Sequence, residues 1–208
     1  MELHSFAGAD GAFPEAPLVI DLYGILYGTT LYGGAYNQGS IFQFANDNVT
    51  VVYSFNGGDD FAPNPPGPFP GVIRNHLDEF FGVTPVGGDY NRGRVYKVNR
   101  LGGMFQTLYS FTGSPDGELP YGELVLDKTG NLYGTTYRGG TYGVGTVFKV
   151  DKTGKETVIW NFTGNSDGAY PHGKLIIDAK GNLYGTTSNG GNLNFCNTGC
   201  GTVFKLTP

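Results

Sequence analysis

Short apolar runs alternate with turn-forming residues along the whole chain. Between residues 120 and 165 these runs predict four strands, over 123–127, 131–137, 145–151 and 156–162, which we call A, B, C and D. Asp127 and Gly130 separate the first two runs, and Asp151 and Gly154 separate the last two. An aspartate that starts a turn, followed by a glycine able to take positive φ, is typical of a hairpin connection. The pattern therefore predicts an antiparallel four-stranded meander.

Strand A is apolar at successive positions instead of alternating with polar residues. It is Leu124-Val125-Leu126 here and Leu175-Ile176-Ile177 further along the chain. A strand without alternation is covered on both faces. We therefore expect neighbouring sheets to pack face to face on it.

The same meander recurs four times in register. The anchoring strings are Leu26-Tyr27-Gly28-Thr29-Thr30, Phe80-Phe81-Gly82-Val83-Thr84, Leu132-Tyr133-Gly134-Thr135-Thr136 and Leu183-Tyr184-Gly185-Thr186-Thr187. A period of about fifty residues made only of strand and turn signals is typical of propeller blades. The sequence predicts an all-β single domain, a β-propeller of four tandem four-stranded antiparallel blades. The repeats cover approximately 1–52, 53–107, 108–158 and 159–208.

The two ends of the sequence complement each other. Residues 2–6 resemble strand D, and residues 201–206 resemble strand C. Pairing between them would cover an open sheet edge. We expect residues 2–6 to complete the fourth blade and close the ring.

Composition excludes several classes of protein. The 36 glycines and 12 prolines beside 14 tyrosines and 15 phenylalanines favour many short strands over helices. The net charge is −5 and no Lys/Arg cluster is present, so nucleic acid is not an expected partner. No apolar stretch is long enough to span a membrane, and no leader pattern opens the chain.

The repeat unit resembles the GloVer-type tandem repeat of bacterial cell-surface proteins. The match lies in Leu-Tyr-Gly-Thr-Thr, a glycine pair, Gly-Thr-Val-Phe-Lys, Ser-Phe and Asp-Gly-x-x-Pro, and it is closest over residues 109–208. Strings 39–43 and 93–97 depart from it. The resemblance implies a secreted or surface-anchored protein, and it supplies no catalytic motif to carry over.

Four loop aspartates and two cysteines leave alternatives open. Each aspartate precedes a proline by four residues, and either caps a turn or helps to bind calcium or sugar hydroxyls; the four are Asp10, Asp59, Asp116 and Asp167. Cys196 and Cys200 are interpreted first as a local disulfide, which fits an oxidising compartment. Two thiols make a poor zinc site, and their spacing is not that of a redox Cys-x-x-Cys motif.

No catalytic signature is found, and no cofactor is expected. A nucleophile elbow, a His-Glu-x-x-His pair and a carboxylate pair spaced for acid and base work are all missing from the sequence. The repeated Gly-Thr-Thr lacks the lysine of a phosphate loop. We interpret its glycine as allowing close approach of a neighbouring blade, and Trp160 as a core residue.

The D–A and B–C loops share one face of such a propeller and are the longer, more varied loops. We expect ligand binding there. The candidate ligand-binding residues are Tyr32, Tyr36, Tyr90, Arg92, Tyr137, Arg138, Tyr142 and Phe195; further polar positions on the face are Asn37, Asp89 and Asn192. Tyrosine beside arginine and asparagine suits a glycan or peptide ligand.

The sequence is therefore consistent with two functions. The favoured one is an extracellular or cell-surface module that binds or adheres without catalysis. The alternative is a hydrolase or lyase with an axial metal or carboxylate site. The sequence does not predict the oligomeric state.

Overall fold

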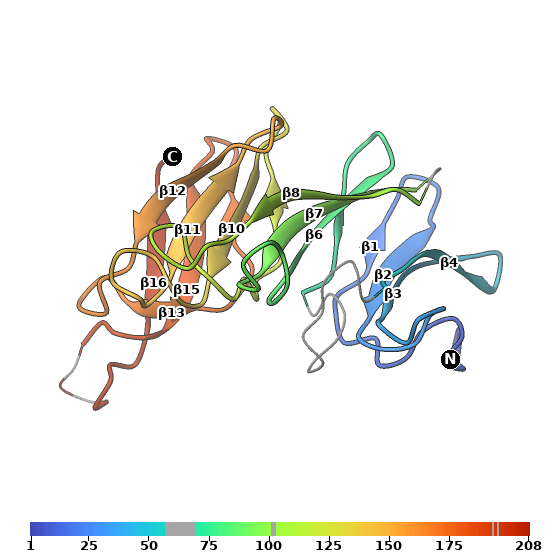
Figure 1. Cartoon of the computed structure of the whole chain (residues 1–208), viewed down its shortest axis with the longest axis horizontal. Helices are drawn as coiled ribbons and strands as arrows, with labels where there is room; N and C mark the ends of the chain where they lie inside the picture. The colour runs from blue at the N-terminus through green and yellow to red at the C-terminus, as the bar shows by residue number, and fades with distance from the viewer. Residues whose placement is uncertain (57–69, 101–102, 193, 195) are drawn as a thin grey trace.

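The computed structural model describes residues 1–208 except 57–69, 101–102, 193 and 195 (Figure 1). The described residues form sixteen strands in four antiparallel sheets. They contain no helix, and hence none that could cross a membrane. The four-blade all-β prediction is confirmed.

Three sheets are simple meanders. The first contains β1 (Val19–Ile20), β2 (Leu26–Thr30), β3 (Ser40–Ala45) and β4 (Asn48–Ser54). The second contains β5 (Ile73–Arg74), β6 (Glu79–Thr84), β7 (Arg94–Asn99) and β8 (Phe105–Ser110). The third contains β9 (Val125–Leu126), β10 (Leu132–Thr136), β11 (Thr146–Val150) and β12 (Glu156–Asn161).

The fourth sheet has a different strand arrangement. It contains β13 (Ala169–Pro171), β14 (Ile176–Ile177), β15 (Leu183–Asn189) and β16 (Thr202–Leu206). β13 and β14 pair with the two ends of β15, and β16 also pairs with β15. Strand A of this blade is thus split in two, and the described residues place no strand D beside β16.

The apolar core is divided among the three junctions between consecutive blades. Ile41, Phe55 and Val72 are buried between the first and second blades. Val95 and Leu124 take part in the equivalent cluster between the second and third. Val147 and Leu175 do so between the third and fourth, so one set of repeat positions builds all three junctions.

A phenylalanine at the end of each strand D, or of the strand-D-like segment 2–6, packs on the blade that follows it. Phe55 meets Tyr96 edge-on with ring centroids 5.5 Å apart. The same contact recurs between Phe111 and Phe148, between Phe162 and Phe204, and between Phe6 and Phe42. The recurrent Ser/Asn-Phe pair of the sequence is therefore a connection between blades.

The glycine of each Leu-Tyr-Gly string makes room for an aromatic ring of its own blade. A Cβ on Gly134 would lie 2.6 Å from Phe148 Cζ, and the two residues are cross-strand partners. Gly28 faces Phe42 in the same way. The expectation that this glycine serves a neighbouring blade is wrong, because the space is filled by the ring opposite it in the same sheet.

The second threonine of the Gly-Thr-Thr string and the residue opposite it on the next strand fasten the blade to the preceding loop. Thr136 Oγ1 and Thr146 Oγ1 lie 2.8 Å apart, and Thr146 Oγ1 donates to the carbonyl of Asp116 at 3.0 Å. Thr202 makes the equivalent bond to the carbonyl of Asp167. The second threonine of the Gly-Thr-Thr string is therefore engaged in structural hydrogen bonds.

Turn aspartates fix the A–B hairpins. Asp127 accepts hydrogen bonds from the backbone N–H groups of Thr129 and Asn131 and from the Asn131 side chain. Partial burial acts to raise the pKa of the Asp127 carboxyl, but these hydrogen bonds outweigh it and lower that pKa to about 2. The predicted turn chemistry is confirmed at this position.

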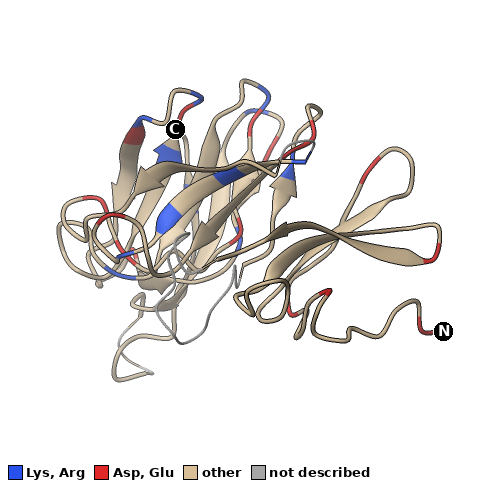
Figure 2. Ribbon diagram, turned by 45° about the vertical axis from the view of Figure 1, so that its right-hand side comes forward, with Lys and Arg blue, Asp and Glu red and all other residues tan. Residues whose placement is uncertain are grey.

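The predicted ring closure is not observed. Residues 2–6 form no strand, and Figures 1 and 2 place the two termini at opposite ends of an open arc. Phe6 and His4 instead lie against the first blade, through Phe42 and Asp10. The sequence pattern identified a strand-D segment, but its partner strand lies at the far end of the arc.

Trp160 and Ile176 are exposed, contrary to expectation. Trp160 is 41% exposed, and its indole N–H donates to Asp167 at the edge of the third blade. Ile176 corresponds to Val125, which packs against the fourth blade, but no described blade follows Ile176. Strand A is therefore covered on both faces only in blades that have a neighbouring blade on each side.

Candidate functional site

The tips of the B–C loops carry three repeat-equivalent tyrosines, Tyr36, Tyr90 and Tyr142. Each side chain is about 60% exposed. Among the described residues no ring contact joins any one of them to another aromatic side chain. These candidates are accessible, and the described residues show no ring contact among the three.

Three other candidates are engaged locally or cannot be placed. Tyr32 packs edge-on against Phe13, with centroids 5.6 Å apart. Arg92 forms an ion pair with Glu118 from the following D–A loop. Phe195 lies outside the described residues.

Tyr137 belongs to an aromatic group at the inner edge of the arc. Its ring centroid lies 5.1 Å from that of Tyr170 and 5.7 Å from that of Tyr121. The Tyr121 ring stacks on His172 at 5.1 Å. The guanidinium of Arg138 lies 5.7 Å from the Tyr137 centroid, in cation–π range. We call Tyr121, Tyr137, Tyr170 and His172 the axial aromatic group.

This group borders a hollow where the start of strand A from every blade converges. The hollow has a volume of about 290 Å³. Its lining comes from equivalent positions of the four repeats: Glu15, Ala16, Pro17, Pro70, Tyr121, Gly122, Glu123, His172 and Lys174. Residues that follow the recurrent proline of each repeat therefore meet at one place.

Glu123 and Lys174 provide opposite charges in the hollow. Lys174 Nζ lies 2.5 Å from Glu123 Oε2, and the Glu123 side chain is only 8% exposed. A Cβ on Gly71 would lie 2.6 Å from Glu123 Oε1. The glycine of the second repeat therefore makes the space that the carboxylate of the third repeat occupies.

A buried hydroxyl lies beside the same lining. Thr135 Oγ1 is buried and has no hydrogen-bond partner among the described residues. It lies 3.1 Å from where a Cβ on Gly122 would be. An unsatisfied buried hydroxyl costs free energy unless water or a ligand bonds to it.

Sequence reasoning missed most of this site. The candidates from the sequence do not include Tyr121, Glu123, Tyr170, His172 or Lys174. The available signal was variation: the position of Glu123 holds Pro17, Gly71 and Lys174 in the other repeats. A position that differs between otherwise regular repeats is not determined by the blade fold.

The loop aspartates are turn caps in the three repeats where they are described. Thr112 donates to Asp116 from both its N–H and its hydroxyl. Thr163 does the same to Asp167, and Ala7 N–H donates to Asp10. Asp59 lies outside the described residues. Their carboxylates are thus already bonded within their own loops.

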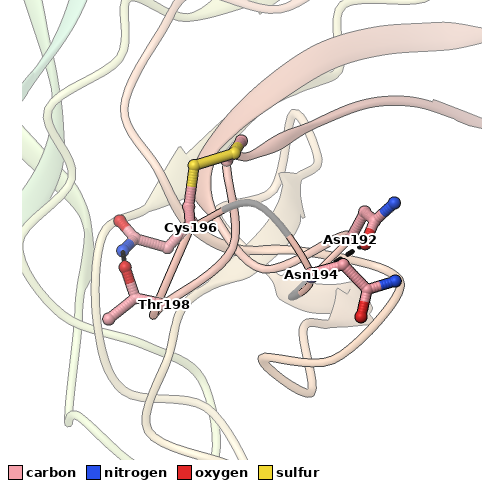
Figure 3. Close-up of a disulfide and its surroundings, with 6 residues drawn as sticks. Asn192, Asn194, Cys196 and Thr198 are labelled. Carbon is pink, nitrogen blue, oxygen red and sulfur yellow. Dashed lines mark hydrogen bonds between the residues drawn. A yellow bond between two sulfur atoms is a disulfide. The ribbon is translucent and has the colours of Figure 1, made fainter.

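Cys196 and Cys200 form a disulfide in the last B–C loop (Figure 3). Asn189 Nδ2 donates to Thr198 Oγ1 inside this loop, and Asn194 N–H donates to Asn192 Oδ1. The predicted pairing is confirmed. No three His, Cys, Asp or Glu side chains in the described part of the chain gather closely enough to hold a metal ion.

Charge is unevenly distributed along the arc. Figure 2 shows Asp and Glu but no Lys or Arg on the N-terminal blade, and residues of both signs on the later blades. All 13 Lys and Arg residues lie between Arg74 and Lys205, where acidic residues are interspersed among them.

Comparison with known proteins supports the family and the fold. The sequence model of the Gloeobacter/Verrucomicrobia repeat matches residues 64–208, and the chain belongs to that family. Among curated protein sequences none matches.

Similar solved structures are β-propellers. A gluconolactonase from Xanthomonas campestris has a TM-score of 0.57 at 15% identity, covering 90% of this chain and 57% of its own. A chain of the nidogen/laminin complex has a TM-score of 0.54 at 18% identity, covering 82% and 56%. TolB from Acinetobacter baumannii has a TM-score of 0.50 at 14% identity, covering 92% and 44%. This chain thus spans little more than half the length of the first two, and the likeness shows the fold alone.

Proposed function

We propose that this protein is an extracellular or cell-surface binding module that holds a glycan at the axial hollow, without catalysis. The observation that carries the proposal is the meeting of four aromatic rings from two blades beside the Glu123–Lys174 ion pair. Aromatic rings offer apolar area to the C–H faces of a sugar, while hydroxyl and charged groups give direction. The repeats differ at these positions, which favours a specific ligand over a purely structural role.

The location outside the cell rests on two features. The repeat unit resembles that of bacterial cell-surface proteins, and a disulfide joins Cys196 and Cys200. Disulfides persist in oxidising compartments and are rare in the cytosol.

The hydrolase or lyase alternative would use the same hollow. Glu15, Glu123 and His172 all line it, and the similar gluconolactonase is an enzyme on the same fold. Glu123 is held by Lys174, however, and the described residues supply no set of three metal ligands. Binding therefore has the stronger structural support.

A glycan array compared with a peptide array tests the proposal. Tyr121→Ala with His172→Ala should lower affinity for the bound glycan, because losing a central aromatic contact typically costs about 2 kcal/mol or more, roughly thirtyfold. The matched control is Tyr36→Ala with Tyr90→Ala, which removes two exposed rings outside the hollow. Circular dichroism checks that both variants fold.

Each other outcome contradicts the proposal in a different way. Loss of binding in the control would move the ligand to the loop tips, and binding to peptides alone would replace the glycan. Turnover of a lactone or glycoside that a chelator abolishes would favour the enzyme. Unchanged glycan binding by the axial variant would exclude the hollow.

A further inference from the structure

The two ends of the arc expose apolar positions that are buried at every internal junction. Val203 on β16 is 82% exposed, whereas its equivalents Ile41, Val95 and Val147 are 0% exposed. Leu18 beside β1 is 54% exposed, whereas its equivalents Val72, Leu124 and Leu175 are at most 1% exposed. Ile176 is 64% exposed, whereas its equivalents Ile73 and Val125 are half-buried and buried. Ile20 is 65% exposed, whereas its equivalents Leu126 and Ile177 are half-buried.

These exposed positions are the two halves of one junction. We call the surface with Ile176 and Val203 the forward face, and the surface with Leu18 and Ile20 the rear face. At the internal junctions Val95 and Leu124 share one cluster, as do Val147 and Leu175. The forward face of the fourth blade therefore matches the rear face of the first in the side chains that such a junction buries.

Backbone pairing at the two ends is complementary as well. β16 pairs with β15 on one side, and the described residues offer its other edge no strand. Residues 2–5 precede Phe6 as β8 precedes Phe111, but they are unpaired. An unpaired edge and an unpaired segment with strand-D sequence can complete each other by strand addition.

The internal blades fix the register of this pairing. Ser40 lies opposite Ser54, Arg94 opposite Ser110, and Thr146 opposite Asn161. In the fourth blade the position of the first residue of each pair is held by Thr202, and the position of the second is held by Ser5. Val203 would then lie opposite His4, as Val147 lies opposite Trp160.

We propose that a second copy of this chain docks head to tail, so that residues 2–5 of one copy add a strand to β16 of the other. Leu18 and Ile20 of the first copy then cover Val203 and Ile176 of the second. This contact continues the junction that the chain makes three times within itself. A heterologous contact of this kind leads either to a closed ring of copies or to an open chain of them.

Sedimentation over a range of concentrations, with two single variants, tests the contact. Val203→Glu destroys the forward face and Leu18→Glu destroys the rear face, with Ile20→Glu as a second rear-face variant in case Leu18→Glu unfolds. Leu77→Glu is the control, because Leu77 is 64% exposed in a turn outside both faces.

The expected result is association of the wild type and of the control as concentration rises. Each face variant alone stays monomeric, because one of the two halves is missing in every copy. An equimolar mixture of Val203→Glu and Leu18→Glu forms a dimer and nothing larger, since one intact face remains on each chain. A monomeric wild type, or association of either variant alone, would overturn the proposal.

Cross-linking tests the register. A Ser5→Cys chain mixed with a Thr202→Cys chain should form a disulfide between chains, whereas neither variant should do so alone. A cross-link within one chain of the double variant, at a concentration where the protein is monomeric, would show instead that the arc closes on itself. Binding of a peptide array member to the forward face without self-association would also contradict a second copy as the occupant.

Discussion

The ring of Phe111, at the end of the second blade, lies edge-on against the ring of Phe148 in the third, with centroids 4.9 Å apart. Phe6 and Phe42 stand at the same distance and the same interplanar angle of 69°. The first contact joins two complete blades, whereas the second attaches only the N-terminal segment. The same type of Phe–Phe contact therefore occurs in two places that differ in how deeply the inserted ring is buried.

Truncating the two inserted rings should have unequal effects on stability. Phe111 is fully buried, so Phe111→Ala should lower the free energy of unfolding by about 3–5 kcal/mol. Phe6 is half-buried, and Phe6→Ala should cost clearly less. Urea denaturation followed by tryptophan fluorescence measures both. Equal losses would show that the N-terminal segment is as important to the fold as a blade junction.

The glycine opposite an aromatic ring should not tolerate a methyl group. In Gly134→Ala the new Cβ would meet Phe148 Cζ at 2.6 Å and Leu124 Cδ2 at 2.9 Å. Overpacking of this kind typically costs about 1–3 kcal/mol. Gly173→Ala is the control, because its Cβ would meet only Thr186 Oγ1 at 3.5 Å. Thermal denaturation should separate the two variants, and a shared melting temperature would refute the steric explanation.

Glu156 should make stability depend on pH. Burial, with a smaller contribution from the charge of Asp116, raises the pKa of the Glu156 carboxyl from 4.5 to about 7, and its Oε1 has no hydrogen-bond partner among the described residues. Between these two pH values the folded chain holds a proton that the unfolded chain has released. The free energy of unfolding should therefore fall as pH rises from 4.5 to 7.

Glu156→Gln isolates this effect, because the amide does not titrate. Urea midpoints measured across that pH range should decline less steeply in the variant than in the wild type. Parallel pH profiles would show that the carboxyl is solvated in the folded protein.

The disulfide should contribute little to global stability. Cys196 and Cys200 are four residues apart. A cross-link that closes so short a loop removes little conformational entropy from the unfolded chain, so its stabilisation should be below the roughly 3 kcal/mol expected for a fifteen-residue loop. Cys196→Ser with Cys200→Ser should therefore shift the denaturation midpoint only slightly. Alkylation followed by mass spectrometry should find no free thiol in the oxidised wild type, and two alkylated thiols would refute the bridge.

Local sequence signals predicted the strands well. Strands B and C of the third blade were expected at 131–137 and 145–151, and they are found at Leu132–Thr136 and Thr146–Val150. Turn chemistry and apolar runs act over a few residues, so they can be recognised in one repeat and checked in the next. Strand A was predicted too long, because Glu123 lines the hollow and Asp127 caps the hairpin turn, which leaves only Val125–Leu126 in the ladder.

Contacts between distant repeats could not be predicted in this way. The stacking of Tyr121 on His172 joins residues 51 positions apart in the sequence. It depends on the angle of rotation between consecutive blades, which local sequence patterns do not determine. That rotation also decides whether residues 2–6 reach β16. Trp160 was assigned to the core because its repeat equivalent is an aromatic, but the neighbouring surface that would cover it differs between blades.

The break between β13 and β14 has a consequence for protein engineering. Residues 172–174 lie between the two short strands without ladder pairing, so their side chains are not restricted to those that suit a pleated sheet. The four repeats of this chain already hold proline, glycine, glutamate and lysine at one equivalent position, that of Pro17, without a change in blade fold. Libraries randomised at Pro17, Glu123 and Lys174 would therefore change the recognition chemistry of the scaffold while leaving its strand pairing untouched.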